Sequence, residues 1–152
     1  MDADLRETFW HAVEDSPFLM VGLAGQPPQP MTAMLDRDAH HAIWFFTSRS
    51  GALAPGGPAQ LSFASRDHKL FAALSGTLSP ENDRATFEKH WSNQVESWFP
   101  GGRADPDLLF LRCDITASEV WKVDMTVAGM FHLMTGRPVE AGEVGDHAVG
   151  RV

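Results

Sequence analysis

The chain has 152 residues, of which 43% are hydrophobic and 21% are charged, and its formal net charge at pH 7 is -8. This composition is ordinary for a globular protein, and the length suits a single domain over residues 1–152 with its own hydrophobic core. The acidic charge and the lack of any run of Lys or Arg argue against nucleic-acid binding, which needs a basic surface.

The sequence carries no signal for a membrane span, secretion or an internal disulfide. No stretch is apolar over the length of a membrane span, and the first residues are acidic rather than basic as in a secretory signal. The single cysteine, Cys113, excludes an internal disulfide and lies in an apolar run, which predicts a core residue. We therefore expect a cytoplasmic protein without membrane contact.

The predicted elements begin with a helix and continue as short strands. Residues 4–15 place Leu5, Phe9 and Val13 on one face at helical spacing, and a proline ends the helix. Gly76 lies in the last of the strands that follow, where it predicts a bulge or a sharp bend. Five strand-like segments, separated by turns rich in glycine, proline or aspartate, cover residues 18–24, 29–35, 42–47, 59–64 and 70–78.

The third predicted strand leads into the stretch around which we expect the function to be organised. Its apolar residues end at the polar cluster Thr47-Ser48-Arg49-Ser50, and a loop rich in glycine and proline follows. Hydroxyls, backbone N–H groups and an arginine at the end of a strand can hold a phosphate, although no glycine motif of a phosphate loop is present. An ordinary polar turn is the alternative interpretation.

The hydrophobic period changes after residue 78. Ser79-Pro80-Glu81 predicts the start of a helix, because it offers a hydroxyl cap, a proline at the first helical position and an acid in the first turn. An apolar stripe at helical spacing then predicts one helix or two abutting short helices. Its members are Phe87, Trp91, Val95 and Trp98. We assign Phe87 and Trp91 to packing and keep Trp98 as a candidate ligand contact.

The C-terminal third returns to strand-like segments over residues 108–115 and 117–123. Residues 125–134 fit helix or coil, and the tail over 135–152 is partly irregular with a short closing segment at 148–152. Consecutive short strands without βα alternation predict a mainly β fold. We expect an antiparallel barrel of six to seven strands, with an N-terminal helix and a helical insertion after the fifth strand.

Several short motifs follow one another along the chain in this order: Phe9-Trp10 to Phe18-Leu19-Met20, Pro30-Met31, Trp44-Phe45-Phe46-Thr47, Ser75-Gly76, Asp83-Arg84, Trp91, Trp98-Phe99-Pro100-Gly101-Gly102 and Asp105-Pro106-Asp107-Leu108. This ordered set resembles the FMN-binding split β-barrel superfamily of pyridoxamine 5′-phosphate oxidase-like proteins. Within it, the sequence is most similar to the general stress protein 26-like family.

The resemblance implies a homodimer with FMN in clefts between the subunits. It also implies that the phosphate lies near the end of the third strand and the ring along the second, third and fifth strands. Carried over by position, the candidate cofactor-binding residues are Gln29, Pro30, Met31 and Thr32 on the second strand, Phe46, Thr47, Ser48 and Arg49 at the end of the third, Lys69 at the start of the fifth, and Trp98 from the partner.

Two places depart from the pattern of that family. Gln29 stands where the family has an arginine before Pro-Met, and Gly51 and Leu53 stand at its Ser-x-Lys pair. Each lost charged hydrogen bond to a phosphate is worth about 1.5–3 kcal/mol. FAD is therefore an alternative cofactor. The groups that remain to bind the phosphate are Arg49 and the neighbouring hydroxyls.

No catalytic residue or metal site is predicted, since the sequence has no nucleophile motif and no metal-ligand spacing. A flavin would supply the redox chemistry itself, so a flavoprotein does not need such motifs. One hypothesis is a flavin-dependent oxidoreductase of unknown substrate. The other is a non-enzymatic, stress-associated ligand-binding dimer that has lost strong binding of the flavin phosphate.

Overall fold

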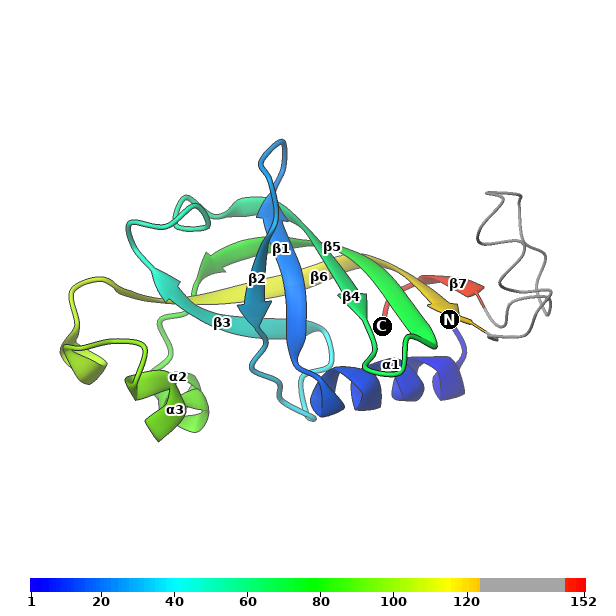
Figure 1. Cartoon of the computed structure of the whole chain (residues 1–152), viewed down its shortest axis with the longest axis horizontal. Helices are drawn as coiled ribbons and strands as arrows, with labels where there is room; N and C mark the ends of the chain where they lie inside the picture. Colours follow the sequence, from blue (N-terminus) through cyan, green and yellow to red (C-terminus); the bar gives the residue numbers. More distant parts are fainter. Residues whose placement is uncertain (124–146) are drawn as a thin grey trace.

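One curled antiparallel sheet organises the chain in the computed structural model, which describes residues 1–123 and 147–152. The strands lie in the order β2-β1-β4-β5-β6-β3, and β7 pairs with β6 (Figure 1). The elements are α1 (Ala3–Asp15), β1 (Phe18–Leu23), β2 (Gln29–Thr32), β3 (Ala42–Ser48), β4 (Gly57–Ala64), β5 (Leu70–Pro80), α2 (Arg84–His90), α3 (Asn93–Glu96), the 3-10 turn η1 (Gly102–Ala104), β6 (Leu108–Lys122) and β7 (His147–Gly150). This is the mainly β, helix-decorated fold that the sequence predicts.

The sheet curls until its two end strands meet at a single point. The backbone N–H of Met34, just beyond β2, donates to the carbonyl of Trp44 on β3 at 2.8 Å, and the reciprocal bond is 3.0 Å. Within β2 and β3 themselves the two strands are not paired with each other. The result is a barrel with a split between β2 and β3.

Helix α1 lies along one end of the curled sheet (Figure 1). Asp2 caps it, because its carboxylate accepts from the Leu5 N–H at 2.9 Å. Its buried face comprises the predicted Leu5, Phe9 and Val13, together with Trp10. Among the described helices, none has the length and hydropathy needed to cross a bilayer.

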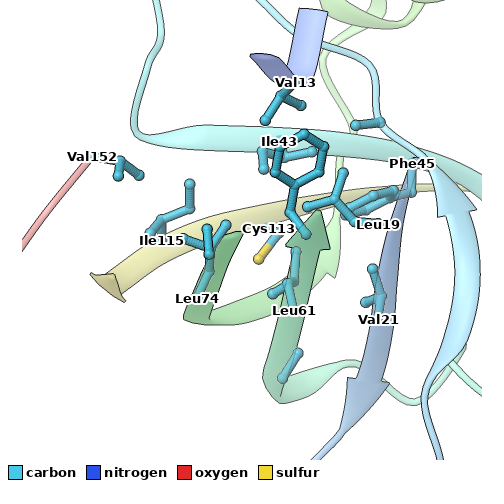
Figure 2. Close-up of a cluster of buried hydrophobic side chains, with 14 of the residues drawn as sticks. Val13, Leu19, Val21, Ile43, Phe45, Leu61, Leu74, Cys113, Ile115 and Val152 are labelled. Atoms are coloured by element: carbon cyan, nitrogen blue, oxygen red, sulfur yellow. The ribbon is translucent and has the colours of Figure 1, made fainter. Parts of the chain in front are cut away.

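Alternate side chains of the strands fill the barrel interior with a largely aliphatic core (Figure 2). Ile43 and Phe45 of β3 and Leu61 of β4 are at most 2% exposed. Cys113 lies among them as a core residue, as predicted, and burial raises the pKa of its thiol to about 12. That thiol has no thiolate character at neutral pH and is no nucleophile.

The predicted irregularity at Gly76 is confirmed. The register between β5 and β6 shifts there, so that Ser75 lies opposite Ala117 and Gly76 opposite Ile115, which leaves Thr116 as the extra residue. A Cβ on Gly76 would meet the Cys113 sulfur at 2.6 Å, which only glycine avoids. The long, bent β6 therefore replaces the two separate strands expected over residues 108–123.

The predicted helix start at Ser79-Pro80-Glu81 is wrong. These residues continue β5, with Ser79 and Pro80 opposite Arg112 and Leu111, and the Glu81 N–H donates to the Phe110 carbonyl at 2.9 Å. Helix α2 begins instead after Asp83, whose carboxylate accepts from the Thr86 N–H at 3.0 Å. Pro80 sits at the last position of the strand, where its missing N–H costs little.

Two further boundaries differ from the expectation. Strand β2 ends at Thr32 rather than at residue 35, because the chain leaves β1 there and rejoins the sheet only through Met34. The expected closing segment pairs with β6 as β7. The alternatives of helix or coil for residues 125–134 lie outside the described residues.

Candidate functional site

The outward face of β3 is covered by the helical insertion and not by solvent. Phe46, a predicted cofactor residue, is only 5% exposed in a second hydrophobic cluster outside the barrel, which we call the outer cluster. Its ring stacks on Phe110 with centroids 4.4 Å apart, and it meets Phe87 and Trp91 edge-on at 5.6 and 5.7 Å. The remaining buried members of the outer cluster are Ala42, Trp44, Val95, Phe99 and Leu108. The side chain of Phe46 is therefore committed to packing, as predicted for Phe87 and Trp91.

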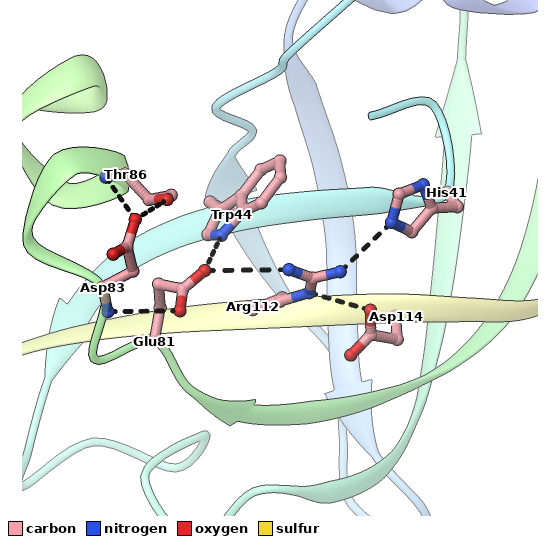
Figure 3. A network of polar contacts seen from close by, with 7 residues as sticks. All are labelled: His41, Trp44, Glu81, Asp83, Thr86, Arg112 and Asp114. Atoms are coloured by element: carbon pink, nitrogen blue, oxygen red, sulfur yellow. Dashed lines mark hydrogen bonds and ion pairs between the residues drawn. The ribbon is translucent and has the colours of Figure 1, made fainter. Parts of the chain in front are cut away.

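A polar network borders the outer cluster and was not predicted from sequence (Figure 3). Glu81 accepts from the Trp44 indole N–H at 3.0 Å, and the Arg112 guanidinium lies 5.4 Å over the same ring. Arg112 also donates to Asp114 at 2.8 Å and contacts His41 Nε2 at 3.1 Å. These contacts tie β3, β6 and the end of β5 together. In the described residues no group of His, Cys, Asp or Glu side chains is arranged to hold a metal ion.

The four candidate residues of β2 alternate between the two faces of the sheet. Gln29 and Met31 lie opposite the buried Val21 and Leu19, on the interior side, and the Gln29 amide contacts the Met31 sulfur at 3.6 Å. Pro30 and Thr32 lie on the outer face, and Pro30 is exposed. No charged side chain replaces the family's arginine at this point of β2.

The split brings backbone groups of β2 and β3 toward each other. The N–H and C=O groups of Met34 and Trp44 point across the split, because those residues form the bridge. In antiparallel strands every second residue directs its backbone groups to the same side, so Thr32 and Phe46 direct theirs into the split as well. Within the described part of the chain, neither residue makes a ladder bond across it. Two strand edges with unpaired backbone donors and acceptors thus lie on either side of the split.

The polar turn at the end of β3 is internally satisfied. The Ser48 hydroxyl donates to the Asp107 carboxylate, and the Ser50 N–H and hydroxyl both reach the same carboxylate at 3.2 Å. Hydrogen bonds from Ser48 foremost, and from Ser50, hold the pKa of the Asp107 carboxyl below its usual value. The hydroxyls that the sequence offered to a phosphate are thus bound to an anion of the chain itself.

The glycine- and proline-rich loop after this turn contributes no cation. Leu53 is 1% exposed and packs into the barrel core, and the Gly51 N–H closes a turn onto the Ser48 carbonyl at 3.0 Å. Gly56 and Gly57 then take φ values of 67° and 102°, which redirect the chain into β4. Residues 49–55 therefore form turns rather than a helix.

Arg49 is exposed, and its backbone N–H donates to the Asp107 carbonyl at 2.7 Å. Its side chain lines a hollow of about 510 Å³ beside the helical insertion, together with Phe87 and Arg103. Arg103 itself pairs with Glu88 at 3.1 Å. Arg49 therefore remains a candidate phosphate contact, but it faces this hollow.

Lys69 lies away from the split within one chain, and Trp98 is exposed after α3. Lys69 is exposed in the turn before β5 and shares a hollow with Thr8 of α1 and Lys122 at the end of β6. That end of β6 is opposite to the end that pairs with Ser48 of β3. Trp98 follows α3 and is 41% exposed. A single chain does not bring Lys69 together with the split between β2 and β3.

The outer face of the sheet carries exposed apolar side chains. Phe18 and Met20 of β1 are 59% and 38% exposed. They line a shallow hollow with Pro30 of β2, Phe71 of β5 and Trp121 of β6. Large exposed apolar patches of this kind mark interaction surfaces.

These features define a split-barrel protein: a curled antiparallel sheet, an N-terminal helix across one end, and a helical insertion packed on β3 and β6. The family model described as "Pyridoxamine 5'-phosphate oxidase like" matches residues 4–140. The chain belongs to this family. Among curated proteins, none matches the chain.

Solved structures of general stress proteins have the same fold. A protein designated general stress protein 26 from Jannaschia sp. CCS1 is 30% identical, with a TM-score of 0.77 and 99% of both chains covered. The general stress FMN/FAD binding protein from Xanthomonas citri is 33% identical, with a TM-score of 0.75, over 93% of this chain and 100% of that one. A general stress family protein from Xanthomonas campestris pv. campestris is also 33% identical, with a TM-score of 0.74, over 91% and 97%. The predicted family and fold are confirmed.

Sequence analysis missed the role of Asp107 at the end of β3. It appears there only as part of the Asp-Pro-Asp-Leu motif, 59 residues after Ser48. No local pattern links the two, because the contact exists only once β3 and β6 are paired. The one usable signal was an acidic residue at the start of a strand that pairs with the end of β3.

Proposed function

We propose that the chain binds a flavin, FMN or FAD, as a cytoplasmic homodimer, with the isoalloxazine ring along the split between β2 and β3. The observation that carries the proposal is the pair of free strand edges at Thr32 and Phe46, in a chain of this family. A relative that is 33% identical is described as an FMN/FAD binding protein.

The chemistry of the split suits the ring of a flavin. One edge of an isoalloxazine carries carbonyl and N–H groups, which match the backbone donors and acceptors of two strand edges. The flat remainder of the ring is apolar and suits the Met31 side chain, which lies on the interior side of β2 against the barrel core. The ring portion of the cofactor therefore fits the residues present.

The apolar outer face supports the proposed dimer. A second copy packed on Phe18 and Met20 would remove these exposed side chains from water. It would also explain why Lys69 lies far from the split of its own chain. In the proposed dimer, Lys69 of the partner subunit and Trp98 of the partner subunit complete the site.

A bound flavin would supply the redox chemistry, so the proposed activity is that of an oxidoreductase of unknown substrate. The second candidate is a non-enzymatic ligand-binding dimer. The hydrogen bonds from Ser48 and Ser50 to Asp107 favour this second candidate, because they occupy donors that strong phosphate binding would use.

The test is a titration of the purified full chain with FMN, FAD and riboflavin, followed by quenching of flavin fluorescence. Saturable binding with about one flavin per chain supports the proposal, whereas no binding of any flavin at high micromolar concentration contradicts it. Light scattering reports the oligomeric state on the same samples.

A substitution on the outer face tests the link between dimer and site. Met20→Lys should give a monomer that binds flavin at least tenfold more weakly, since burying an unpaired ammonium in an apolar interface is costly. His11→Lys, which adds the same charge on the exposed face of α1, is the matched control and should change neither property.

A further inference from the structure

The polar groups at the end of β3 already have an anionic partner. Asp107 receives hydrogen bonds from both hydroxyls of the turn and from the Ser50 N–H, and its own N–H donates to Asp105 at 2.9 Å. Asp105 in turn accepts from the Gly101 N–H at 2.9 Å. Two carboxylates thus lie together where β3 ends and β6 begins.

Among the described residues, no cationic side chain is bonded to Asp107, whose partners are Ser48 and Ser50. Leu53 is buried in the barrel core and cannot present a charge. Arg49 and Arg103 line a hollow beside the helical insertion that also includes Asp105, and Arg103 is paired there with Glu88. A phosphate placed at the hydroxyls would have to displace Asp107 or lie beside it, and like charges at such distances repel.

We propose that Asp107 is an internal anion that excludes a terminal phosphate from the end of β3, so that the site holds the ring and polyol chain of a flavin and binds riboflavin at least as tightly as FMN. This inference rests on the proposed flavin binding at the split. The residues present fit the ring of the cofactor but do not fit its phosphate. Asp107 thus determines specificity through its own negative charge, and hydrogen bonds from Ser48 and Ser50 hold the carboxylate in place.

The expected effect can be stated as a ratio of dissociation constants. A site with charged hydrogen bonds to the phosphate binds FMN more tightly than riboflavin by about tenfold for each such bond. In this chain the ratio should be about one or should favour riboflavin. Added salt should strengthen FMN binding relative to riboflavin, because it screens repulsion rather than attraction.

The test compares riboflavin and FMN by fluorescence quenching in the wild-type chain and in Asp107→Asn. The substitution removes the charge but keeps the shape and an acceptor for Ser48, so the affinity for FMN relative to riboflavin should rise by about tenfold. Asp105→Asn removes the same charge from the same loop without touching either serine, and should change the ratio less. Thermal unfolding of both variants reports whether the loop remains folded.

A second variant keeps the inference testable if Asp107→Asn does not fold. Ser50→Ala removes the hydrogen bonds of the Ser50 hydroxyl to Asp107 Oδ1 and to the Ser48 hydroxyl. It should leave the wild-type ratio of FMN affinity to riboflavin affinity unchanged. A wild-type chain that binds FMN tenfold or more tightly than riboflavin overturns this inference alone. A chain that binds neither flavin overturns the proposed function and this inference with it.

Discussion

The barrel core and the outer cluster are two hydrophobic cores that share one strand. Ile43 and Phe45 of β3 point into the barrel, where their neighbours are mostly aliphatic. Trp44 and Phe46 point outward, where the insertion of α2 and α3 covers them with aromatic rings. Ile43 and Phe45 are completely buried in the barrel core, whereas the rings of Phe87 and Trp91 in the outer cluster are only partly buried.

The apolar run of β3 is continuous because each face of the strand packs into one of the two cores. Both faces of the strand are occupied by packing, so its side chains are not available to a ligand along most of its length. Its backbone edge toward β2 and the polar turn at its end remain. The edge has free groups, and the turn is closed by Asp107.

The largest predicted effect is a cavity in the barrel core. Phe45→Ala should lower the free energy of unfolding by about 3–5 kcal/mol, because Phe45 is fully buried among rigid neighbours. Urea unfolding followed by tryptophan fluorescence measures it. Glu7→Ala on the exposed face of α1 is the control and should stay within about 0.5 kcal/mol.

The matched substitution in the outer cluster should cost less. Phe110→Ala leaves a cavity beside Phe46, but the partly exposed rings of Phe87 and Trp91 can relax into it. We expect a loss of about 2–3 kcal/mol by the same measurement. An equal loss for Phe110→Ala and Phe45→Ala would show that the outer cluster is as rigid as the barrel core.

The third prediction concerns the helix that closes the outer cluster. Asp83→Ala should lower the free energy of unfolding by about 0.5–2 kcal/mol, because it removes the cap of α2. Ser79→Ala, at the position that sequence alone predicts as the cap, should change it by less than about 0.5 kcal/mol. The reverse order of effects would contradict the observed start of the helix.

The smallest effect is a pH dependence at His90, which stacks on Trp44 at 5.1 Å and lies near Phe110. Burial lowers the pKa of His90, and the charge of Lys89 adds to this, against the opposing charges of Asp36 and Glu81. The neutral ring is thus favoured in the folded state. Its contribution to stability is present above the ordinary pKa of about 6.5 and is lost as pH falls through the lowered value.

The chain should therefore unfold at lower urea concentration at pH 5.5 than at pH 7.5, and His90→Gln should flatten this difference. Hydrogen bonds from Arg37 and Lys89 lower the pKa values of Glu14 and Asp36, so these carboxyls stay ionised across this window. An unchanged difference in His90→Gln would assign the pH dependence to another group.

Most of the fold could be predicted from sequence because its signals are local. The helical face of Leu5, Phe9 and Val13, the strict alternation in β4 and the glycine at the β5 bulge each determine their own element. The start of α2 was misplaced because Ser79-Pro80-Glu81 satisfies the rules for a helix start as well as Asp83 does. Only the pairing of β5 with β6 decides between them.

The site was less predictable, because its properties depend on pairing between distant strands. Two features follow from the register of β3 against β6: the side chain of Phe46 points outward, and Ser48 donates to Asp107. The run Trp44-Phe45-Phe46 does not reveal which ring faces which core. The sequence likewise does not reveal that the hydroxyls of Ser48 and Ser50 are already hydrogen-bonded to Asp107.

The most direct test of the account is the binding surface itself, mapped by amide chemical shifts of the ¹⁵N-labelled chain titrated with riboflavin. The account predicts the largest shifts at the facing strand edges, at Thr32 and Phe46, with small shifts at Ser50 in the turn closed by Asp107. Largest shifts at Ser50 and its neighbours in the turn, with none at the two strand edges, would contradict it.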